Sequence, residues 1–239
     1  EGKLGKAFDP YRLYPGPNKD IRLEDLTMRP EITAERLKDR VTLLKGINGS
    51  MKELDKAVSG YALNEYYEKA YDLVLSGKAR DAFDLTKETE KVRDRYGRTT
   101  FGQGALLARR LVEAGTRFVQ LNWPAVANGN PEVDSWDTHA ANFGPLKNLH
   151  CPVLDRSLSA LIEDLDQRGL FKDTLLVAIG EFGRSPRIGV STSGNTNAPD
   201  GRDHWPYCYT GIIGGAGVKR GFQYGTSDAT ASAPSGNPV

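Results

Sequence analysis

The chain has 239 residues, with 32 Lys and Arg against 31 Asp and Glu, and a formal net charge of +1. This length suffices for one large domain or two small ones with a substantial core. The balanced charge, without a basic stripe, argues against a nucleic-acid partner, and no apolar run approaches the roughly 18 residues of a membrane span.

The first half of the chain is predicted to be mainly helical. Residues 1–32 are rich in Pro, Gly and Asp, which indicates an irregular lead-in. Residues 33–115 repeat apolar side chains at helical spacing, for example at Leu106, Leu107 and Leu111, with turn residues between the periodic segments. This section holds no histidine, so we expect it to contribute no metal ligands.

Residues 116–225 have the pattern of an α/β unit. The stretches "TRFVQLNW" (116–123), "TLLVAIGEF" (174–182) and "CYTGIIGG" (208–215) each predict a short buried strand. Between the first two lies one apolar helical stripe, made by Leu154, Leu158, Leu161, Ile162 and Leu165, with Gly169 where a helix C-cap belongs. Continuous apolar strands alternating with a helix predict a largely parallel sheet flanked by helices. Residues 226–239 are small and polar and predict a loop or a disordered tail.

Three loops beside these strands carry the candidate functional residues. Asp134, Asp137 and His139 follow the first strand; Glu181 and Arg184 follow the second; Arg202, Asp203 and His204 precede the third. Ligands in open parallel sheets bind at the carboxyl ends of strands, so we expect Asp137, His139 and His204 to converge there.

The residue types in these loops suit a metal ion beside an anion. Carboxylates and imidazoles are ligands for zinc, manganese and related divalent ions, and arginines such as Arg184 and Arg202 can bind an oxyanion in a bidentate manner. Together they predict hydrolysis of a charged ester. Each residue also has a structural interpretation: His139 could bond a backbone group, and Glu181 and Arg184 could form an ion pair. The ring of His204 could simply pack on Trp205, and His150 is expected to have a structural role.

Longer phrases resemble a known family. "VDSWDTHAANFGPLKN", "GEFGRSPRI" and "GRDHWPYCY", in this order, resemble the bacterial family called domain of unknown function 1501, from about Leu4 to Thr226. That family is similar to the alkaline phosphatase-like superfamily, which includes sulfatases. The resemblance implies an incomplete α/β fold of that type holding a divalent ion (zinc, manganese or calcium).

The resemblance also implies roles for particular residues. Asp137, His139 and His204 match ligands of one metal site, with Glu181 assisting and Arg184 and Arg202 steadying the anion. Phe182 stands where the superfamily has a ligating histidine, which puts a second metal site in doubt. The short spacing from Asp137 to His139 keeps Asp134 as a candidate ligand.

Two functions follow from the resemblance. The first is part of a metal-dependent hydrolase of sulfate or phosphate esters, acting on an anionic small molecule or glycan. Family members carry a nucleophile-bearing N-terminal part that is not found here, so the chain is expected to be an inactive internal fragment. The second is a non-catalytic module that binds an anion or glycan. Export to the periplasm or cell surface is implied by the resemblance alone.

For Asp203, alternation of side chains along an extended segment predicts that it points away from His204. We therefore expect Asp203 to pair with Arg202 or Arg184, and expect a separate acceptor to hold the second ring nitrogen of His204.

Overall fold

The protein is described by a computed structural model that covers residues 12, 32–50, 78–123, 136–192 and 198–237. The chain divides into two compact units, one comprising Glu1–Lys87 with Ala114–Thr116 and the other Glu88–Glu113 with Arg117–Val239. Within the described residues, no helix is long and apolar enough to cross a membrane.

The described part of the first unit contains helical elements only. Helix α1 spans Ala34–Ser50, α3 spans Lys78–Phe83, and the 3-10 turn η4 spans Leu85–Lys87. The hydroxyl of Thr33 accepts the backbone N–H of Arg36 at 3.1 Å, so it satisfies one of the donors that the start of α1 leaves without a partner.

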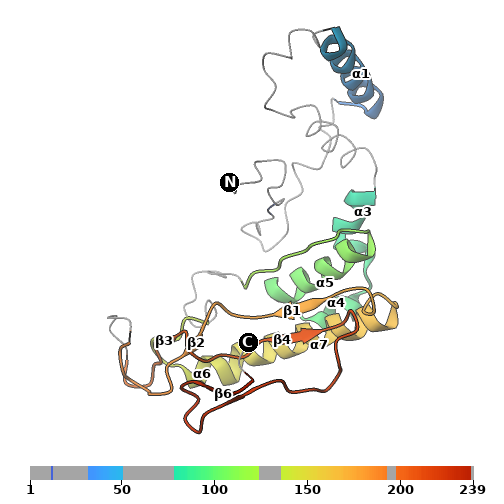
Figure 1. The fold of residues 1–239 in the computed structure, drawn as a ribbon. Coiled ribbons are helices and arrows are strands. Elements are labelled where there is room, and N and C mark those ends of the chain that lie inside the picture. The colour runs from blue at the N-terminus through green and yellow to red at the C-terminus, as the bar shows by residue number, and fades with distance from the viewer. Residues whose placement is uncertain (1–11, 13–31, 51–77, 124–135, 193–197, 238–239) are drawn as a thin grey trace. The chain divides into compact units, whose positions relative to one another are not determined.

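The second unit is built on α4 (Glu90–Tyr96), α5 (Thr100–Glu113) and α7 (Cys151–Gln167), with α6 (Phe143–Pro145) and the π-turn η5 (Leu146–His150) leading directly into α7 (Figure 1). The side chain of Thr89 caps α4. Gly102 lets α5 start close to the end of α4, because a Cβ there would lie 2.4 Å from the carbonyl oxygen of Tyr96.

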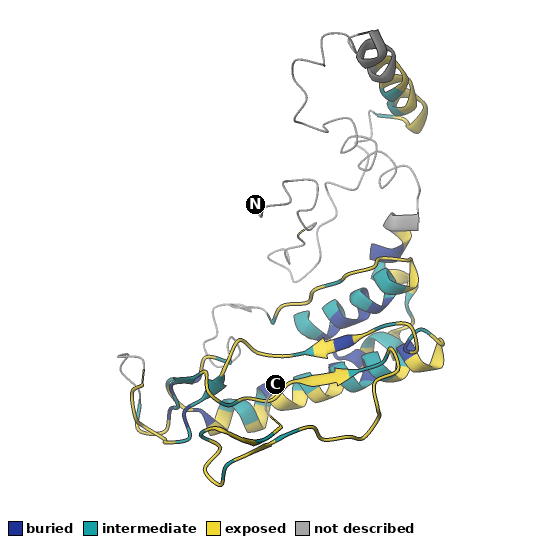
Figure 2. Cartoon of the chain, viewed as in Figure 1, coloured by how far each residue is buried: buried dark blue, intermediate teal, exposed yellow. Residues whose placement is uncertain are grey.

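The predicted amphipathic helix is confirmed by α7. Leu158, Leu161 and Ile162 pack against the buried cluster of Leu165, Phe171 and Leu176. Gly169 has a positive φ of 69°, and Leu170 donates its N–H to the carbonyl of Leu165, which ends the helix where the sequence indicates. Figure 2 shows buried residues along the helices, whereas the strand β4 (Ile212–Gly214) beside them is largely exposed.

The predicted parallel sheet is wrong. Strand β1 (Leu176–Ala178) pairs antiparallel with β4 (Ile212–Gly214), β2 (Gly183–Arg184) pairs antiparallel with β3 (His204–Trp205), and β5 (Thr226–Ser227) pairs antiparallel with β6 (Pro234–Gly236). The described strands therefore form separate two-stranded ladders and not an alkaline phosphatase-like α/β fold.

The physical reason is a chain reversal between β2 and β3. The chain reverses direction between Arg184 and His204, so β3 returns along β2 and β4 returns along β1. Ser185 N–H to Asp203 carbonyl (2.8 Å) and Gly189 N–H to Gly201 carbonyl (2.8 Å) extend the same pairing into the loop. The stretches predicted as the second and third parallel strands are two arms of one long hairpin.

The first predicted strand, residues 116–123, is not a strand in the structure. Phe118, which we expected to be buried, is 77% exposed, and Leu121 is partly exposed. An apolar run indicates that a segment favours burial or strand pairing, but it does not indicate which segment it pairs with. Residues 116–123 pair with no described strand.

A buried charge network joins α5 to α7. The guanidinium of Arg109, whose side chain is 1% exposed, lies 2.7 Å from Glu88, 2.6 Å from Glu113 and 2.9 Å from Asp164. Arg110 also contacts Glu88, and Arg168 contacts both Glu113 and Asp164 at 2.7 Å. Such a network stabilises the helix pair only while each buried charge keeps its partners.

Burial raises the pKa of Glu88, but hydrogen bonds and positive charge from Arg109 and Arg110 outweigh burial and hold the pKa below its ordinary value. The stabilisation from this carboxylate is therefore present above the unfolded pKa and is lost as the pH falls through the lower folded pKa. We expect Glu88→Gln to reduce the free energy of unfolding by about 1–3 kcal/mol near pH 7, and the difference from wild type to narrow below about pH 4.5. Urea unfolding across this pH range measures both effects.

Glu163→Gln is the matched control, because Glu163 pairs with Arg95 on the surface and its side chain is 57% exposed. It should cost less than about 0.5 kcal/mol. Equal losses in the two variants would contradict a stabilising role for the buried network.

Candidate metal centre

The segment at 138–142 docks beside the loop arm of the hairpin through backbone hydrogen bonds. Arg202 N–H donates to the Thr138 carbonyl at 3.0 Å, and Ala198 N–H donates to the His139 carbonyl at 3.0 Å. This close approach requires glycine at 201, where a Cβ would lie 1.8 Å from the carbonyl oxygen of His139. The docking brings His139 beside β3, which carries His204.

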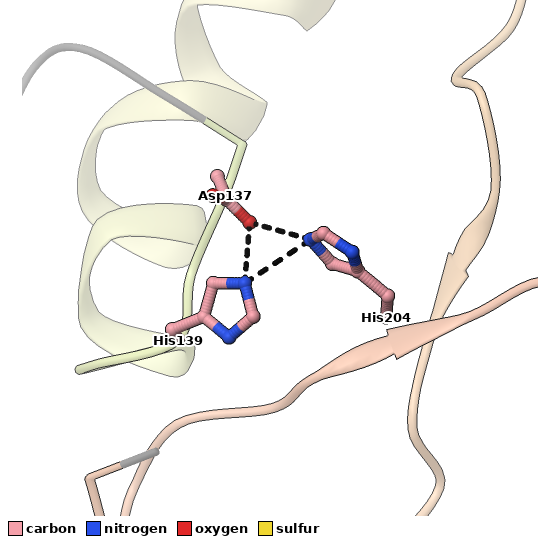
Figure 3. Close-up of side chains that lie close together, drawn as sticks. All are labelled: Asp137, His139 and His204. Carbon is pink, nitrogen blue, oxygen red and sulfur yellow. Dashed lines mark hydrogen bonds and ion pairs between the residues drawn. The ribbon is translucent and has the colours of Figure 1, made fainter. Parts of the chain in front are cut away.

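Three side chains meet at this junction (Figure 3). The Nε2 atoms of His139 and His204 are 3.1 Å apart, and each lies 3.0 Å from Oδ1 of Asp137. The three atoms therefore form a nearly equilateral triangle. Asp137 is the most open of the three, with 53% of its side chain exposed, against 20% for His139 and 33% for His204.

Arg184, which lies on β2, holds Asp137 in place. Its Nη2 donates to Oδ1 of Asp137 and to the carbonyl of Trp136, both at 2.7 Å, and its Nη1 donates to the carbonyl of Arg202 at 3.1 Å. Burial raises the pKa of Asp137, but hydrogen bonds from Arg184 and His204 and the neighbouring charges outweigh it and lower the pKa. Asp137 is therefore an anion at neutral pH.

Arg202 stabilises the same junction through hydrogen bonds to backbone carbonyls. Its guanidinium donates to the carbonyl of Arg184 at 3.2 Å and to the carbonyl of Ser185. Arg184 and Arg202 thus bridge β2 and β3 reciprocally. An anion bound by either arginine would share or displace these carbonyl partners.

The carboxylate of Asp203 makes contacts that the sequence did not indicate. Its carboxylate is fully buried and contacts the ring of His139, with 3.4 Å between Oδ1 and Nδ1, and the backbone N–H groups of Thr192 and His204. The ring of His204 instead packs on Phe182, with 4.4 Å between centroids. Sequence reasoning missed this role because the alternation rule concerns neighbours on one strand, whereas His139 arrives from a different segment.

The other predicted site residues are placed as follows. Glu181 is exposed and is not among the three residues whose ligand atoms gather in the described part of the chain. Asp134 lies outside the described residues. His150 is buried between aromatic rings, 5.3 Å from Trp136 and 5.6 Å from Trp123 by centroids, as a structural histidine would be.

The described part of the protein is a helical unit with short antiparallel ladders and a polar cluster at the loop end of its long hairpin. The family model described as "Protein of unknown function (DUF1501)" matches residues 1–239, and the chain belongs to that family. No curated protein and no solved structure matches the chain.

We expect Arg184→Lys to reduce the free energy of unfolding by about 1–2 kcal/mol, because an ammonium cannot reproduce the planar fork that serves three acceptors. Chemical unfolding followed by circular dichroism measures the loss. Arg187→Lys, at an exposed residue on the same loop arm, is the control and should be neutral within about 0.5 kcal/mol. Indistinguishable stabilities for the two variants would show that Arg184 does not brace the junction.

Proposed function

We propose that Asp137, His139 and His204 bind one divalent metal ion, and that the resulting centre belongs to a hydrolase of phosphate or sulfate esters. The observation that carries the proposal is the triangle formed by the two Nε2 atoms and Oδ1 of Asp137.

No arrangement of protons makes all three sides of this triangle favourable. If both Nε2 atoms carry a proton, two donors face each other across 3.1 Å. If only one does, the lone pair of the other nitrogen faces the carboxylate anion across 3.0 Å. A cation at the centre would accept all three lone pairs, which is the usual reason for a carboxylate and two imidazoles to converge.

The size of the triangle also suits such an ion. Each corner is about 1.75 Å from the centre, which does not exceed the roughly 2.0–2.1 Å of a metal–ligand bond, so Asp137, His139 and His204 could all hold one ion. Three protein ligands with an open position are typical of catalytic centres, whereas structural zinc sites are closed by four.

A bound divalent ion would supply Lewis acidity and a water of lowered pKa, reaching about 7 in zinc enzymes. The chain's own residues would do the rest. His139 and His204 would hold the ion through neutral rings, and Asp137 would supply negative charge. Arg184 would keep Asp137 oriented, and the aromatic ring of Phe182 would shield one side of His204.

Isothermal titration of the wild-type chain with Zn²⁺ or Mn²⁺ should give one binding site per chain. Loss of a residue that only holds a ligand in place weakens metal binding about 10–100-fold. His204→Ala should weaken binding by more than this, because it removes a ligand itself. His150→Phe, which keeps a ring in the buried aromatic cluster, is the control and should bind as wild type does. Absence of binding in wild type, or unchanged affinity in His204→Ala, would refute the metal centre.

The reaction is tested separately with the metal-loaded chain. Release of nitrophenol from nitrophenyl phosphate or nitrophenyl sulfate, lost in His204→Ala, would support the hydrolase. Metal binding without turnover, together with tight binding of inorganic phosphate or sulfate, would favour the non-catalytic anion-binding module instead.

A further inference from the structure

Asp203 is the second carboxylate of the junction, and it is not one of the three clustered ligands. Its exposed fraction is 0%. Oδ1 accepts the backbone N–H of His204 at 2.8 Å, and Oδ2 accepts the backbone N–H of Thr192 at 2.5 Å. The hydroxyl of Ser191 lies 3.5 Å from Oδ2. Two backbone donors thus fix this carboxylate independently of any histidine ring.

The fixed carboxylate faces one particular ring nitrogen. Oδ1 is 3.4 Å from Nδ1 of His139, while Nε2 of the same ring is a corner of the triangle with Asp137 and His204. A carboxylate accepts hydrogen bonds and donates none, so it favours a proton on Nδ1. In the neutral ring, that proton leaves the lone pair on Nε2, where the triangle needs it.

We propose that Asp203 is a positioning residue of the metal centre, which holds His139 in the Nδ1–H tautomer and aims its Nε2 lone pair at the ion; this inference rests on the proposed function. The distance of 3.4 Å exceeds the 2.7–3.2 Å of a formed N–H···O bond. A small rotation of the His139 ring would close this gap, and the charge-assisted bond to Asp203 would then hold the ring.

Asp203 also connects the centre to the 191–192 segment. Thr192 donates its N–H to Asp203 and its hydroxyl to the carbonyl of His204 at 2.7 Å. A purely structural role for Asp203 would consist of this bracing alone. The two roles differ in what a change at 203 does to the metal affinity and to the His139 ring.

The experiment compares Asp203→Asn with Asp200→Asn by calorimetric titration with Zn²⁺. Asp200 is an exposed carboxylate on the same loop arm, and it accepts the N–H of Ala141, which an amide oxygen can also do. Asp203→Asn should weaken Zn²⁺ binding about 10–100-fold, because an amide in that place must turn its NH₂ group toward either Thr192 N–H or the His139 ring. Asp200→Asn should bind within about twofold of wild type.

A second measurement needs no variant and remains decisive if Asp203→Asn does not fold. Long-range ¹H–¹⁵N spectra of the wild-type chain at pH 8 report which ring nitrogen of His139 carries the proton. The proposal expects Nδ1–H with and without Zn²⁺; a proton on Nε2 in the metal-free chain would overturn it.

The outcomes separate this inference from the proposed function. Unchanged Zn²⁺ affinity in folded Asp203→Asn, with weakened binding in His204→Ala, would overturn the positioning role and leave the metal centre intact. A wild-type chain that binds no divalent ion would overturn both.

Discussion

The constraint on which this region depends is the burial of the Asp203 carboxylate. A buried carboxylate is costly unless donors surround it, and its backbone donors, the N–H groups of Thr192 and His204, come from separate parts of the hairpin. The backbone N–H of Thr192 donates to Oδ2 of Asp203, and the ring of His139 faces Oδ1 of the same carboxylate. Gly201 makes this possible, since any side chain there would collide with the backbone of His139.

The sequence indicated which three side chains gather more successfully than it indicated what surrounds them. Only three histidines occur in the chain, and two of them lie beside carboxylates in loops that adjoin apolar runs, so the gathering of Asp137, His139 and His204 could be anticipated from residue type and position. The contact between Asp203 and His139 could not. It depends on how the segment at 138–142 docks through its backbone, and side-chain patterns do not encode that docking.

The fold shows the same division between local and long-range information. Helix α7 was predictable because its apolar stripe and Gly169 are local signals. The strand direction was not, because a continuous apolar run is typical both of a buried parallel strand and of an exposed hairpin arm. Val177 and Ile213, which pair across β1 and β4, are 51% and 58% exposed, so their apolar character did not indicate burial on both faces. The Gly-, Ser- and Asn-containing stretch between the two runs was the signal for a reversal.

The antiparallel register has a consequence for the charge of the proposed centre. Because Arg184 pairs with His204 across β2 and β3, a guanidinium and an imidazole ligand lie on the same side of the ladder. Asp137 then accepts from Arg184 through the oxygen that faces the two rings. Two carboxylates, Asp137 and Asp203, lie at the junction with two guanidiniums, those of Arg184 and Arg202. A bound divalent ion would therefore leave an excess of positive charge. An anion would offset that excess, which is consistent with the proposal of a phosphate or sulfate ester as substrate.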